Sequence, residues 1–145
     1  MANKLSTILT EIKTALTAAL TTGGTPILKK FEYGLLYPDK VKDFPAMGMV
    51  IDSTTRASGS IWTTPILFPF VVRQGDSRDI NKTITDVAIE IIAALDAWQA
   101  ADRSNGGSIE NTSFDVWWHP QFNPLAPIGG VIRVVLTVEG PLKTT

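Results

Sequence analysis

Residues 61–73 read Ile-Trp-Thr-Thr-Pro-Ile-Leu-Phe-Pro-Phe-Val-Val-Arg, and this stretch decides the fold. Side chains alternate between the two faces of a strand, so apolar residues at every second position predict a strand with one face in a core. The apolar even positions are Trp62, Ile66, Phe68, Phe70 and Val72. Three odd positions are apolar too, namely Ile61, Leu67 and Val71. We therefore expect a long strand covered on both faces, with more apolar surface than the isolated chain buries.

Pro65 and Pro69 interrupt this strand at positions of the same parity. Proline has no backbone N–H, and N–H groups alternate sides along a strand, so both missing donors point toward the same neighbour. On that side the strand is either an edge of the sheet or is interrupted by a bend.

Two amphipathic helices flank the strand in the sequence. Asn3 is a suitable N-cap for the first helix, expected over 4–21, and Gly23-Gly24 ends it. Its apolar stripe contains Leu5, Ile8, Leu9, Ile12, Leu16 and Leu20. The second helix is expected over 78–100, with Asp76 and Asp79 interpreted as cap and helix-dipole partners rather than as a metal site. Its stripe contains Ile80, Ile84, Val87, Ile91, Leu95 and Trp98.

The other strands are shorter, and turn-rich stretches separate them. They are expected at 27–33, 47–51, 114–118 and 130–138, with loops at 34–45, 53–60 and 101–108. The resulting order is α-β-β-β-α-β-β. It predicts an α+β fold with a mainly antiparallel sheet and both helices packed on one face. No repeat or linker divides the chain, so residues 1–145 are expected to form a single domain.

Composition excludes several classes of protein. The chain has 145 residues, of which 44% are hydrophobic, and it has no cysteine, which removes disulfides and thiolate metal sites. Its 13 Lys and Arg against 14 Asp and Glu give a net charge of −1, without the basic excess typical of nucleic-acid binding. No stretch is long and apolar enough for a bilayer. These features favour a soluble protein of the cytoplasm that does not bind membranes.

Catalytic patterns are absent from the sequence. His119 is the only histidine, which excludes paired-histidine metal sites, and its place between Trp118 and Pro120 favours a structural role. No Gly-x-Ser-x-Gly elbow accompanies it, and Gly129-Gly130 lacks the lysine of a phosphate-binding loop. We expect no enzyme activity, no catalytic residue, no cofactor and no metal.

The outer helix faces carry few charges. On the first helix, the positions opposite the apolar stripe are Thr10, Thr14, Thr17 and Thr21. Solvated helix faces usually carry Glu and Lys, so this threonine stripe is either a contact with another chain or a plain polar surface. Ile89 and Ala93 occupy the outer face of the second helix, and we interpret them in the same way.

The segment 119–127 holds three prolines, which favour a stiff, extended connection. Phe122 and Leu125 lie between them. These side chains either fold back onto the core or form an arm that reaches another subunit. We favour the arm, because a connection between adjacent strands rarely needs so many residues.

This layout resembles that of tail terminator (tail completion) proteins of tailed bacteriophages. The resemblance covers nearly the whole chain: an amphipathic first helix, a loop ending in Phe44-Pro45-Ala46 before a strand, a long strand, a central helix with Ile91-Ile92-Ala93-Ala94-Leu95, and two closing strands.

The resemblance implies a structural virion protein of the phage tail or neck, assembled in the bacterial cytoplasm. Such a protein forms a homo-oligomeric ring, typically a hexamer, that caps the tail tube and stops its polymerisation. Its partners would be further copies of itself, the tail tube protein and a head–tail connector protein. DNA would pass through the lumen without specific binding. The alternatives are another neck or tail component, such as a head-closure, connector or baseplate protein, or a non-viral protein-interaction domain.

Overall fold

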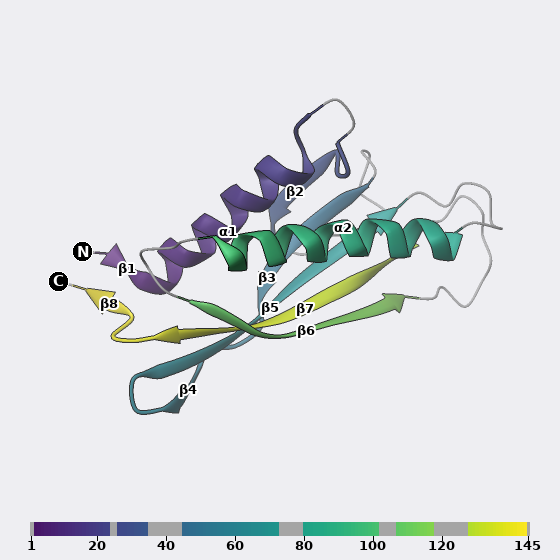
Figure 1. The fold of residues 1–145 in the computed structure, drawn as a ribbon. Helices are drawn as coiled ribbons and strands as arrows, with labels where there is room; N and C mark the ends of the chain where they lie inside the picture. Colours follow the sequence, from purple (N-terminus) through teal and green to yellow (C-terminus); the bar gives the residue numbers. More distant parts are fainter. Residues whose placement is uncertain are drawn as a thin grey trace.

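Strand β5 (Ile61–Val72) lies at the centre of the main sheet in the computed structural model (Figure 1). It pairs antiparallel with β7 (Ile128–Glu139) along its whole length and with β3 (Ala46–Ile51) on its other side. Beyond these, β6 (Ser108–Trp117) pairs antiparallel with β7, and β2 (Lys30–Tyr33) pairs parallel with β3. The structure describes residues 2–23, 26–34, 45–72, 80–101, 107–117 and 128–144.

Helices α1 (Lys4–Leu20) and α2 (Ile80–Ala100) pack together on one face of this sheet (Figure 1). Asn3 caps α1 as expected, because its side chain accepts a hydrogen bond from the Ser6 N–H at 3.1 Å. Most buried residues of the two helices belong to the expected stripes: Ile8, Leu9, Ile12, Leu16 and Leu20 on α1, and Ile84, Val87, Ile91, Leu95 and Trp98 on α2. Ala88, which the expected stripe did not include, is buried as well. These residues form one core with the even-numbered residues of β5 and β7.

The predicted α+β fold, with its mainly antiparallel sheet and helices on one face, is confirmed. Three strands were not expected. They are β4 (Thr55–Ser58), which pairs with the start of β5, and β1 (Ala2–Asn3) and β8 (Lys143–Thr144), which pair with each other. The expected loop over 53–60 is therefore partly wrong, because Gly59 turns the chain into a β4–β5 hairpin with a φ of +54°.

The backbone groups of the two prolines in β5 point toward β3, the side on which their N–H donors are missing. The interpretation as an edge is wrong, since β5 has a neighbour on both sides. Instead, the pairing with β3 is interrupted: Met47 pairs with Phe70 and Val50 with Leu67, and the two positions between are skipped, one of them Pro69. At Pro65 a single hydrogen bond forms: the Asp52 N–H donates to the Pro65 carbonyl at 3.0 Å, and proline has no N–H to return a second one. A central strand thus accommodates two missing donors.

Gly130 has a packing role rather than a phosphate-binding one. The rings of Phe70 and Phe114, on strands either side of β7, lie stacked with centroids 6.0 Å apart. A Cβ on Gly130 would lie 2.9 Å from the Phe114 ring and 2.6 Å from the Asp115 carbonyl oxygen. Only glycine fits beneath this aromatic pair.

We expect Leu16→Ala to lower the free energy of unfolding by about 2–4 kcal/mol, because Leu16 is fully buried and its truncation leaves a cavity. Ile89→Ala is the matched control, since Ile89 is a helical residue of similar size with 57% of its surface exposed. Urea denaturation of both variants measures the difference. Equal losses would contradict the assignment of the two faces.

Candidate protein-interaction surfaces

The threonine stripe (Thr10, Thr14, Thr17 and Thr21) lies on the side of α1 away from the core. Thr10 and Thr14 are exposed, and Thr17 and Thr21 are half-buried. Three of the hydroxyls donate to the backbone carbonyl one turn earlier: Thr10 to Ser6 at 2.8 Å, Thr17 to Lys13 at 2.6 Å and Thr21 to Thr17 at 2.6 Å. Since a hydroxyl has one hydrogen to donate, these threonines present methyl groups and an acceptor oxygen to their surroundings. Removing water from such a surface costs little free energy, because the hydroxyl donors are already bonded within the helix.

Lys13 borders the stripe and protects the edge of the sheet. Its Nζ donates to the Phe31 carbonyl at 2.9 Å and to the Thr17 hydroxyl at 3.4 Å, and it lies 4.2 Å from the Phe31 ring centroid. Burial lowers the pKa of the Lys13 ammonium, and the Glu32 carboxylate partly opposes this shift. The Lys13 side chain thus occupies the Phe31 carbonyl of β2, which an added strand would need for pairing.

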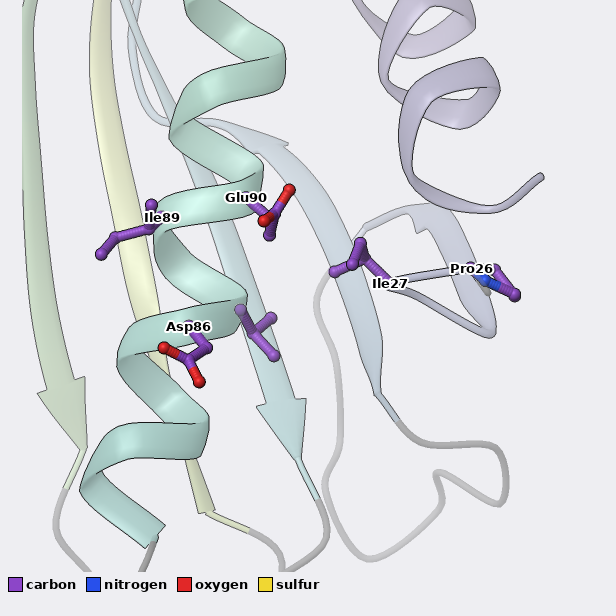
Figure 2. Close-up of a pocket in the computed structure, with 6 residues that line it drawn as sticks. Pro26, Ile27, Asp86, Ile89 and Glu90 are labelled. Atoms are coloured by element: carbon purple, nitrogen blue, oxygen red, sulfur yellow. The ribbon is translucent and has the colours of Figure 1, made fainter. Parts of the chain in front are cut away.

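The outer face of α2 carries Ile89 and Ala93, and both are exposed as expected. A groove of about 410 Å³ crosses the first half of this helix, lined by Pro26, Ile27, Asp86, Val87, Ile89 and Glu90. Glu90 projects from α2 toward Ile27, whereas Ile89 projects from the other side of the helix (Figure 2). The groove therefore combines apolar walls with two carboxylates.

The β4–β5 hairpin is a surface that the sequence analysis missed. All four residues of β4 are exposed, and Ile61, at the start of β5, is 40% exposed. The Arg56 guanidinium lies 4.7 Å from the Trp62 ring centroid, within the range of a cation–π contact. The hairpin extends beyond the helices at one end of the sheet (Figure 1). The Ser58-Gly59-Ser60 turn before alternating apolar residues was the signal in the sequence.

The open face is the side of the sheet turned away from both helices (Figure 1). Its residues on β5 and β7 include Pro65, Leu67, Val131 and Val135, which are half-buried, and Arg133, which is exposed. Val71, at the far end of this face, is fully buried. In the single chain the open face of β5 is covered near Val71 and partly uncovered near Ile61, as expected of a strand with more apolar surface than the isolated chain buries.

Some predicted residues lie outside the described part of the chain. Phe122, Leu125 and His119 are among them, so the arm of 119–127 stays a prediction. Within the described ranges, no group of His, Asp and Glu is arranged to hold a metal ion. Neither α1 nor α2 has the length and hydropathy that crossing a membrane requires.

The sequence matches no protein-family model, and no curated protein matches it.

We expect Thr14→Lys to leave the melting temperature nearly unchanged but to weaken association with other chains, because contact would bury an unpaired charge. Thr14→Val is the control, since it keeps the size and the branching without adding charge. Differential scanning fluorimetry measures the first effect and sedimentation velocity the second. Undiminished association of the lysine variant would mean that the threonine stripe faces water.

Proposed function

We propose that this chain is a structural virion protein, a tail terminator that forms a ring, caps the phage tail tube and offers the surface to which the head attaches. The observation that carries the proposal is the pair of unlike surfaces that the fold leaves uncovered: the projecting β4–β5 hairpin, and the helix layer with its threonine stripe and groove. A protein that acts by packing against other chains needs such surfaces.

The geometry favours a ring over a two-fold dimer. A two-fold contact uses one self-complementary patch on both subunits, whereas a head-to-tail contact between different patches leads from one copy to the next and forms a ring when the rotation closes. The hairpin and the first half of α2 lie toward opposite ends of the sheet (Figure 1). Their separation suits head-to-tail contacts.

The layout of the chain supports the terminator among ring-forming proteins. The resemblance to terminators rests on the order of two helices and a long central strand. The fold has its elements in that order. A net charge of −1 is compatible with DNA that crosses a lumen without being held there. A head-closure, connector or baseplate protein would share the uncharged surfaces, so the tail tube has to be part of the test.

We expect the purified chain to form a closed ring, either alone or on tail tubes, because single copies leave apolar surface uncovered. Light scattering after gel filtration gives the mass with and without tubes assembled from the phage's tail tube protein. Electron microscopy then measures tube length when the chain is added during polymerisation, with Leu16→Ala, weakened in folding, as the inactive control.

Shorter tubes of limited length, with protein at one end, would support the terminator. A ring that leaves tube growth unchanged would favour another neck component. A chain that stays monomeric and never binds tubes would contradict the proposal.

A further inference from the structure

The groove on α2 has a definite chemical character. Asp86 and Glu90 are one helical turn apart, so their carboxylates lie on neighbouring positions of one face. Both residues are exposed, and the described residues that line the groove are apolar or acidic. Asp86 already takes part in an interaction within its own chain, so Glu90 is the carboxylate considered for a partner. Ile27, in the segment before β2, and Val87, on α2, supply the apolar lining of the groove. A fitting occupant presents an apolar side chain beside a positive charge.

The β4–β5 hairpin has this combination. Arg56 lies over Trp62, which holds the guanidinium in place and lowers the entropy lost on binding. Ile61 on the same hairpin is one of four large hydrophobic residues that are exposed in the described part of the chain, and the others are Tyr33, Ile51 and Ile89. The hairpin therefore offers a cation, an exposed aliphatic side chain and a projecting backbone.

Two of the other exposed cations, Lys30 and Arg133, fit less well. The Lys30 ammonium lies 3.6 Å from the Glu32 carboxylate, which already pairs with it. Lys30 is also only three residues after Ile27, which lines the groove of the same chain. Arg133 lies in the middle of β7, on the open face between two neighbouring strands. Neither projects from the body of the fold as Arg56 does.

The hairpin cannot readily reach the groove of its own chain. The C-terminal end of α2 lies at the hairpin end of the sheet, because Gln99 bonds to Ser108 and Ile109 at the start of β6. Glu90 is nine residues earlier, about 14 Å along the helix at 1.5 Å per residue. A hairpin that fills this groove therefore has to come from another copy.

We propose that the hairpin of one copy docks into the α2 groove of the next copy, with Arg56 against Glu90 and with Ile61 against the apolar wall. This contact rests on the proposed function only in requiring that the chain assembles with itself. It is heterologous, so repeating it forms a ring when the rotation between copies closes.

Charge reversal tests the contact. Arg56→Glu and Glu90→Arg should each weaken self-association by roughly tenfold or more, because each places like charges together. The double variant Arg56→Glu/Glu90→Arg should recover most of the loss, since it restores an opposite pair. Lys143→Glu, at an exposed cation in β8 outside the candidate surfaces, is the matched control and should associate like the wild type. Sedimentation velocity measures association, and thermal melting checks that each variant folds.

Two results would overturn the contact while leaving the proposed function intact: an assembling chain in which neither reversal has an effect, or a double variant as weak as the single ones. If Arg56→Glu abolishes tube binding but not self-association, the hairpin docks on the tube protein and the second copy is the wrong occupant. A wild-type chain that never assembles, even on tubes, would defeat both proposals.

Discussion

The pairing of β5 with β7 is the constraint on which the rest of the structure depends. Twelve successive residue pairs, from Ile61 with Glu139 to Val72 with Ile128, fix which side chains of both strands face the helices. A slip of one residue would turn the core residues of a strand toward the opposite face. The same register places the β4–β5 hairpin at one end of the sheet. The register of β5 with β7 therefore determines both the core and the position of the projecting hairpin.

Much of this fold could be predicted from periodicity. Both helices, the long strand and the side of each helix that is buried follow from apolar spacing, as Leu16 and Ile91 illustrate. Pairing partners could not be predicted, because period-two patterns do not say which strands meet. Pro65 and Pro69 left two alternatives, an edge strand or an interrupted one, and tertiary packing decides for a central strand with gaps in its pairing with β3. Strand β4 was missed because its residues are exposed and carry no burial signal.

The candidate surfaces were predictable only in part. Sequence spacing located the threonine stripe and Ile89, since helix geometry alone decides which residues lie outward. It did not indicate that three threonine hydroxyls donate to their own helix, which makes the stripe less polar than its composition suggests. The groove joins residues near 26 and near 88, and the hairpin stacks Arg56 on Trp62. Both depend on tertiary contacts that no local pattern contains.

The central claim is that the surfaces left uncovered by the fold are those that pack against other chains. Hydroxyl-radical footprinting, read by mass spectrometry, tests it most directly by comparing the separated subunit with the subunit assembled on tail tubes. The account predicts that labelling of Ile61 and Ile89 falls on assembly, while the buried Ile8 stays unlabelled in both states. An assembly in which Ile61 and Ile89 are labelled as strongly as in the separated subunit would contradict it.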